Sequence, residues 1–229
     1  MEFDEVIFKL RTYHNPKNVE GMARFGINPA NTLGISVPTL RAMAQEIGIN
    51  HNLAQRLWDS GIHEARILAT MIDDPEKVTV RQMDKWVKDF DSWDVCDQCC
   101  SNLFDKTKWA TQKATQWAAS REEFVKRAGF VLMATLAVHD KKAINAQFQR
   151  YLPIIKREST DERNFVKKAV NWALRQIGKR NLALNRYAIE TARQIERKDS
   201  ATARWIAKDA LRELTSQSVR SRFKNKTVR

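Results

Sequence analysis

Residues 161–178, Asp-Glu-Arg-Asn-Phe-Val-Lys-Lys-Ala-Val-Asn-Trp-Ala-Leu-Arg-Gln-Ile-Gly, carry the pattern that decides the fold. Their apolar side chains recur at helical spacing, at Phe165, Val166, Ala169, Val170, Ala173, Leu174 and Ile177. At about 100° per residue these positions form one unbroken stripe along an α-helix. A helix with such a stripe needs an apolar partner, so the segment predicts a core shared with neighbouring helices.

The same spacing extends over most of the chain, whereas the strict alternation of apolar and polar residues that marks strands is hard to find. Seven Gly and five Pro are few for 229 residues. We therefore predict an all-α protein, with further helices over residues 2–13, 16–25, 36–48, 50–59, 63–72, 80–90, 92–104, 106–119, 121–138, 143–156, 182–195 and 201–214. Helix pairs recur at roughly 35 to 45 residues, a spacing that fits a helical-repeat solenoid and an ordinary helical bundle equally well.

The chain is strongly basic, with 40 Lys and Arg against 27 Asp and Glu and a net charge of +13. This excess indicates a polyanionic partner, with nucleic acid ahead of an anionic membrane surface. Residues 216–229 contain no acid and five cations, Arg220, Arg222, Lys224, Lys226 and Arg229. We expect one folded domain over residues 1–215, which keeps a charge of +8, and a flexible basic tail over residues 216–229.

The start of the chain, Met-Glu-Phe-Asp-Glu, lacks the basic region and apolar run of a signal peptide. The longest uncharged and mostly apolar run, residues 128–139, is too short to span a bilayer. We expect a protein of the cytoplasm, or of the nucleus in a nucleated cell, without a membrane partner.

All three cysteines lie together, as Cys96, Cys99 and Cys100. This clustering predicts reduced thiols in the core rather than a disulfide framework. No second pair of Cys or His residues lies at ligand spacing, so we expect no metal site and no cofactor.

The cysteines belong to residues 92–104, Ser-Trp-Asp-Val-Cys-Asp-Gln-Cys-Cys-Ser-Asn-Leu-Phe. Ser92 is a good N-cap for a helix that opens at Trp93. Trp93, Asp97, Cys100 and Phe104 share one side of that helix, so a carboxylate interrupts an otherwise apolar surface. Burial of an unpaired charge costs several kcal/mol. Asp97 therefore has a structural ion-pair partner, stays solvated on a tilted helix, or takes part in chemistry.

Two further places break the local pattern in a similar way. Arg127 stands at the edge of the strongly apolar helix 121–138, where it either reaches solvent, pairs with Glu123, or binds a phosphate or carboxylate. Trp172 lies at the margin of the apolar stripe in 161–178, on the same side as three cations, Lys168, Arg175 and Lys179. Such an aromatic residue either closes the rim of the core or packs against a sugar or base while the cations hold phosphates.

Four short motifs give the chain a family resemblance. They are Gly-Ile-Ser-Val-Pro-Thr-Leu-Arg (34–41), Ser-Trp-Asp-Val-Cys-Asp (92–97), Phe-Val-Lys-Arg-Ala (124–128) and Phe-Val-Lys-Lys-Ala-Val-Asn-Trp-Ala-Leu-Arg (165–175). In this order and at compatible spacing they resemble the DNA alkylation repair enzymes of the AlkD type. The resemblance implies a superhelical stack of HEAT-like antiparallel helix pairs with a concave basic face.

The resemblance also implies site residues. The family's catalytic carboxylate falls on Asp97, its aromatic walls on Trp93 and Trp172, and its phosphate contact on Arg127. Lys126 stands where the family commonly has a second arginine, and we expect it to bind DNA together with the cations beside Trp172, namely Lys168, Arg175 and Lys179. The cysteines beside Asp97 and the basic tail depart from the family pattern, which leaves the substrate range open.

The implied activity is excision of cationic N3- or N7-alkylpurines from duplex DNA. No lysine is required to form a Schiff base, so the enzyme would be monofunctional and leave an abasic site. We expect a monomer whose partner is duplex DNA that contains alkylated bases. The alternative is a non-catalytic helical-repeat module that binds nucleic acid or an acidic protein.

Overall fold

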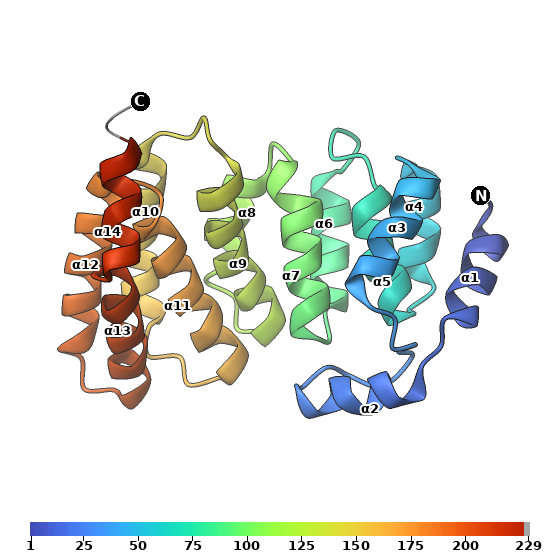
Figure 1. Ribbon diagram of the computed structural model, residues 1–229, viewed down its shortest axis with the longest axis horizontal. Coiled ribbons are helices and arrows are strands. Elements are labelled where there is room, and N and C mark those ends of the chain that lie inside the picture. Colours follow the sequence, from blue (N-terminus) through green and yellow to red (C-terminus); the bar gives the residue numbers. More distant parts are fainter. Residues whose placement is uncertain (227–229) are drawn as a thin grey trace. The chain divides into compact units, whose positions relative to one another are not determined.

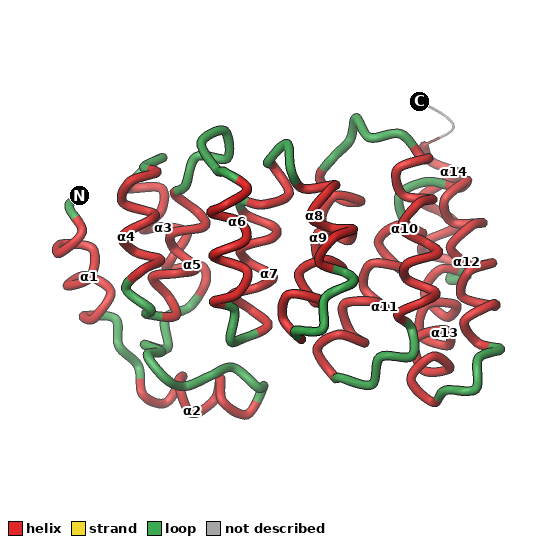
Figure 2. Tube along the Cα trace, turned by 180° about the vertical axis from the view of Figure 1, so that it is seen from behind, coloured by secondary structure: helices red, strands yellow, loops and turns green. Residues whose placement is uncertain are grey.

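The computed structural model describes residues 1–226, which are helical and contain no strand (Figure 1). Within this range, loops join fourteen α-helices and two 3₁₀ helices (Figure 2). These are α1 (Phe3–Thr12), α2 (Pro16–Arg24), α3 (Val37–Ile47), α4 (His51–Asp59), α5 (His63–Ile72), α6 (Val80–Trp86), η1 (Val87–Asp89), α7 (Trp93–Asn102), η2 (Phe104–Lys106), α8 (Ala110–Trp117), α9 (Glu123–His139), α10 (Asn145–Glu158), α11 (Asn164–Gly178), α12 (Leu182–Glu196), α13 (Ala201–Leu214) and α14 (Gln217–Lys226). The predicted all-α class is confirmed. None of the helices in the described range is long and apolar enough to cross a membrane.

Polar side chains fix the start of many of these helices. A side-chain oxygen of the N-cap residue accepts a hydrogen bond from a backbone N–H of the first turn at Asn15, Ser36, Asn50, Thr79, Asn181 and Ser200. Each such bond satisfies an N–H group that the helix itself leaves unpaired and contributes about 1 kcal/mol. Ser92 also stands at an N-cap, but its hydroxyl accepts instead from the Asn28 N–H, at 2.9 Å.

Residues 1–109 form the first of two compact units, and its core is built on aromatic side chains. The indole rings of Trp58 on α4 and Trp86 on α6 stack with their centroids 4.0 Å apart. Phe90 packs against Trp58 and Phe104 against Trp86, and all four rings are buried. Helix α5 contacts α3, α4 and α7 and so forms the centre of this unit. Helix α2 differs from its neighbours, because it lies crosswise to them in Figure 1 and has no buried residue.

The second compact unit begins at Ala110. Helix α9 packs against α8 and α11, and α11 packs in turn against α12 and α13. A Cβ atom at Gly129 would lie 2.4 Å from the Ala118 backbone nitrogen, so only glycine allows α9 to approach the end of α8 this closely. The stripe predicted for 161–178 is buried in α11, apart from the half-buried Phe165. The single domain over residues 1–215 stays a prediction, since the two units are each defined by contacts within themselves and these contacts do not test whether the units form one domain.

The C-terminal segment requires a correction. We predicted a flexible tail from residue 216, but residues 217–226 form α14, which packs against α13. Val219 and Phe223 lie one helical turn apart and are only 3% and 8% exposed. This short apolar face holds the helix on the unit despite its many cations. The last part of the predicted tail, residues 227–229, lies outside the described residues.

Candidate active site

Helix α7 positions Trp93 and Asp97 at the border between core and solvent. Most of the helix faces the core, because Val95, Cys96, Cys99 and Cys100 are fully buried. Trp93 and Asp97, four residues apart, are both half-buried. The helix therefore presents a carboxylate and an indole together at the border of the core, whereas the sequence indicated only that the two share one side of the helix.

The cysteines form the buried side of α7, and all three are free thiols. Burial raises the pKa of the Cys99 and Cys100 thiols well above the ordinary range, and neighbouring thiols add to the effect. A thiol whose pKa is raised stays protonated and unreactive at neutral pH. The prediction of reduced core thiols is therefore confirmed. Among residues 1–226, no group of three or more His, Cys, Asp or Glu side chains is arranged to hold a metal ion.

Trp93 is fixed by a contact to the segment that follows α2. Its indole Nε1 donates a hydrogen bond to the Phe25 carbonyl at 3.1 Å. A cavity of about 540 Å³ opens beside the indole, lined mainly by apolar residues of α2, α3, α5 and the intervening loop, which include Met22, Phe25, Ile27, Ile35, Val37 and Ile67. Asp94 lines this cavity as well, whereas Asp97 does not.

Asp94 and His63 form a pair at this cavity that the sequence did not reveal. The His63 Nε2 lies 2.9 Å from an Asp94 carboxylate oxygen, and the His63 side chain is only 3% exposed. Burial by itself lowers the pKa of His63, but the hydrogen bond to Asp94 and the nearby carboxylates outweigh it and raise the pKa above its ordinary value. The pair joins the start of α5 to the start of α7. The two residues are 31 positions apart, so no local pattern connects them.

Arg127 is buried in α9, with 5% of its surface exposed. Its guanidinium donates a hydrogen bond to the Phe165 carbonyl at 2.6 Å, and Phe124 and Phe165 pack together beside this bond with ring centroids 5.5 Å apart. This contact ties α9 to the first turn of α11. Trp172 lies two turns further along α11 and is half-buried, which agrees with its predicted position at the margin of the apolar stripe of this helix.

The cations beside Trp172 differ in their surroundings. Lys168 is exposed. Arg175 forms ion pairs with Asp209, at 3.0 Å, and with Glu213, which also accepts a hydrogen bond from Lys179 at 2.8 Å. Burial raises the pKa of Glu213, but the two cationic donors outweigh it and hold the pKa below its ordinary value. Of the three cations predicted to bind phosphate, Arg175 and Lys179 thus form ion pairs that connect α11 to α13.

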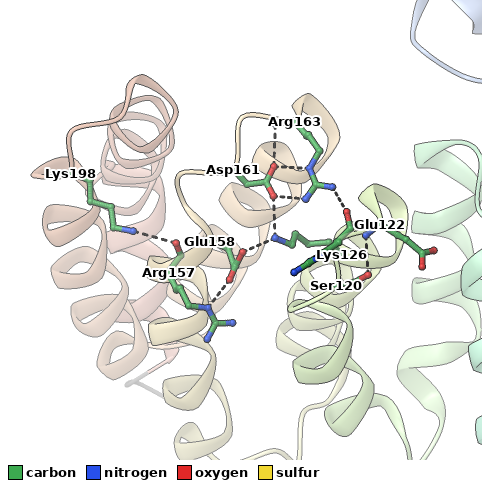
Figure 3. A network of polar contacts seen from close by, with 9 residues as sticks. Ser120, Glu122, Lys126, Arg157, Glu158, Asp161, Arg163 and Lys198 are labelled. Atoms are coloured by element: carbon green, nitrogen blue, oxygen red, sulfur yellow. Dashed lines mark hydrogen bonds and ion pairs between the residues drawn. The ribbon is translucent and has the colours of Figure 1, made fainter.

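Lys126 lies in an ion-pair network at the end of α10 (Figure 3). Its ammonium group is 2.7 Å from Glu158 and 3.2 Å from Asp161, and its side chain is 11% exposed. Arg157 pairs with Glu158, and Arg163 with Asp161. The contacts show Lys126 as a link between α9, α10 and the loop before α11, whereas a role in DNA binding stays a prediction.

Residues 6–214 match the family described as DNA alkylation repair enzyme. The chain belongs to this family. It is 23% identical to the uncharacterized protein Lin0241 of Listeria innocua, over 84% of this chain and 86% of that protein. It is also similar to a solved structure from a new family of proteins related to the HEAT-like repeat DNA glycosylases, with affinity for branched DNA structures. That likeness has a TM-score of 0.78 at 20% identity and covers 93% of this chain and 96% of the other.

The structural likeness establishes the fold of this DNA alkylation repair family member as a HEAT-like helical repeat, which resolves the choice between a solenoid and a bundle. The predicted family resemblance is confirmed as well. Of the predicted site residues, Trp93 and Asp97 belong to the first unit, whereas Lys126, Arg127, Lys168, Trp172, Arg175 and Lys179 belong to the second. Their roles, and the predicted concave basic face, stay predictions.

Proposed function

We propose that the chain is a monofunctional DNA glycosylase that hydrolyses the N-glycosidic bond of purines alkylated at N3 or N7 in duplex DNA. One observation carries the proposal: a half-buried carboxylate, Asp97, lies one helical turn from a half-buried indole, Trp93, on a helix that mostly faces the core. Membership of the DNA alkylation repair enzyme family supports it.

The chemistry suits a site with a single carboxylate. Alkylation gives the base a positive charge, so the base can leave without protonation. Water attacks C1′ of the deoxyribose, the C1′–N bond breaks, and its electron pair neutralises the departing base. Asp97 opposes the positive charge that develops on the sugar and accepts the proton that the water releases.

The aromatic residues would stabilise the same positive charge. The face of an indole attracts a cation by about 0.5 to 2 kcal/mol, and we assign this role to Trp93 and Trp172. The hydrogen bond from Trp93 to the Phe25 carbonyl fixes the orientation of the first indole. We assign contact with a flanking phosphate to Arg127, whose side chain is oriented by its bond to the Phe165 carbonyl.

The test is release of 7-methylguanine and 3-methyladenine from methylated duplex DNA. We expect release by the wild-type protein and a loss of about 10²- to 10⁴-fold in the single-turnover rate for Asp97→Asn, which keeps the shape of the side chain but removes its charge. Asp4→Asn is the matched control, because Asp4 is exposed on α1. Absence of release by the wild type would refute the glycosylase proposal, and undiminished release by Asp97→Asn would refute the role of Asp97.

A second candidate is a module that binds nucleic acid or an acidic protein without chemistry. The structural neighbour's family is described as having affinity for branched DNA structures, which favours a nucleic-acid partner. This candidate predicts tight binding to a four-way junction in the presence of excess linear duplex, with no base released from methylated DNA. Equal affinity for the junction and the linear duplex, together with base release, would exclude it.

A further inference from the structure

A basic cavity of about 420 Å³ lies in the second unit, and none of the proposed catalytic residues lines it. Its walls come from the ends of α9 and α11, the start of α12, and α14. Four of the lining residues are cations and none is an acid; the cations are Lys141, Lys179, Arg180 and Arg222. A recess surrounded by cations from several elements favours an anion.

Two of the cations are held in place by backbone carbonyl groups. Arg180 donates to the carbonyls of Ala137, at 3.0 Å, and Ala143, at 2.9 Å, and its guanidinium lies 4.5 Å from the centroid of the Phe148 ring. The ammonium group of Lys141 donates to a carbonyl of the last turn of α9, that of Val138. Because these side chains are already ordered, an anion that binds them loses little of their conformational freedom.

Helix α14 supplies the fourth cation. Arg222 is exposed, and its guanidinium has no hydrogen-bond or ion-pair partner among the side chains that the structure describes. Val219 and Phe223, both buried, fix the helix so that Arg222 faces the cavity. Unlike the other three cations, Arg222 therefore has its full donor capacity available for a ligand.

Two acids near the cavity, Glu213 and Asp140, offset part of its charge, and the Asp140 carboxylate acts on the Arg180 guanidinium. Glu213 pairs with Lys179 but is shared with Arg175, and the Asp140 carboxylate accepts hydrogen bonds from the backbone N–H groups of Lys142 and Ala143. The N-cap of α12, Asn181, also lines the cavity, which places the positive end of a 15-residue helix there. The surroundings combine positive charge with many N–H donors, and phosphate esters match this combination best.

We propose that this cavity binds a phosphate of the DNA backbone and that α14 completes the site through Arg222. The inference deepens the proposed function, since it rests on DNA binding, but it does not depend on base release. It assigns a specific role to the basic C-terminal segment, for which the sequence alone indicated only non-specific attraction.

The test compares Arg222→Gln with Arg220→Gln in the full chain. Both changes remove one cation from an exposed position on α14, but Arg220 does not line the cavity. Binding to undamaged linear duplex is measured by fluorescence anisotropy over a range of salt concentrations. One lost phosphate contact lowers the slope of log K against log salt by about 0.9, which is about an eightfold loss of affinity at 0.1 M salt. We expect this loss for Arg222→Gln and an unchanged slope for Arg220→Gln.

A second arm uses adenosine monophosphate as the probe, with calorimetric titration of the same proteins. In one outcome the nucleotide binds more weakly to Arg222→Gln alone, while the salt dependence of DNA binding is unchanged in both variants. The cavity would then be a phosphate site for a free nucleotide rather than for DNA. Equal DNA slopes for the two variants and no difference in nucleotide binding would overturn the inference. If the wild-type protein releases no base from methylated DNA but Arg222→Gln still lowers the salt slope of DNA binding, the glycosylase proposal is refuted. This inference is then unaffected.

Discussion

Replacement of Lys126 separates a structural role from a role in DNA binding. Lys126→Met keeps most of the aliphatic stem but removes the ammonium group that lies between Glu158 and Asp161. Loss of one partner from a fully buried ion pair costs about 3 to 5 kcal/mol. Here both carboxylates keep an arginine partner, Arg157 for Glu158 and Arg163 for Asp161, and some solvent reaches the group. We therefore expect a loss of about 1 to 3 kcal/mol in the free energy of unfolding.

The measurement is urea denaturation, with the free energy taken from the midpoint at an unchanged m value. Lys168→Met serves as the comparison, because Lys168 is an exposed lysine of the same unit and a predicted DNA ligand. We expect Lys168→Met to change stability by less than about 0.5 kcal/mol. In DNA binding we expect the reverse: the salt slope falls for Lys168→Met by about 0.9 and stays constant for Lys126→Met.

One combination of results refutes this reasoning. If Lys126→Met unfolds at the wild-type urea concentration and also lowers the salt slope, then Lys126 leaves its carboxylate partners to bind phosphate. The DNA-binding role predicted from the sequence would then be correct.

Three further predictions concern the scaffold. Glu64 is fully buried and accepts hydrogen bonds from the backbone N–H groups of three residues, among them Gly34 at 2.6 Å. Glu64→Gln should therefore lower the free energy of unfolding in urea by about 2 to 3 kcal/mol, and a loss below about 0.5 kcal/mol would contradict this. Gly129→Ala places a Cβ 2.4 Å from the Ala118 nitrogen and should lower the melting temperature of the second unit, whereas an unchanged melting temperature would mean that α9 shifts at no cost. Hydrogen bonds from Arg163 lower the pKa of Asp161 from 3.8 to about 2, so its stabilisation is complete above pH 4 and is lost as the pH falls towards 2. Asp161→Asn should remove about 1 to 2 kcal/mol at pH 7 and little at pH 2, and an equal loss at both values would exclude this linkage.

The sequence predicted those features that depend on residues close together in the chain. The stripe of α11 is a repeat within one helix, and the shared side of Trp93 and Asp97 follows from their spacing on α7. Helix boundaries were less accurate: the segment predicted as a helix over 106–119 contains a turn, and α8 begins only at Ala110. Helix α14 was missed because its apolar face consists of little more than Val219 and Phe223.

Features that join distant residues could not be predicted in this way. Lys126 meets Glu158 and Asp161 from 32 and 35 positions away, so its neighbours in the sequence contain no sign of the ion pairs. The pair of His63 and Asp94 forms only when α5 packs against α7. The family resemblance supplied the candidate site, because the motifs that carry the candidate residues lie far apart in the chain.

The lack of buried residues in α2 has a thermodynamic consequence. A helix of nine residues without a buried side chain is held by few contacts, so it opens at a much lower free energy than the core of its unit. One of these contacts is the hydrogen bond from the Trp93 indole to the carbonyl of Phe25, the residue that follows the helix. Local unfolding of α2 and release of that indole are therefore linked. A ligand that holds Trp93 in place stabilises α2 against local unfolding and slows amide hydrogen exchange in that helix. By reciprocity, an ordered α2 strengthens binding of the ligand by the same free energy.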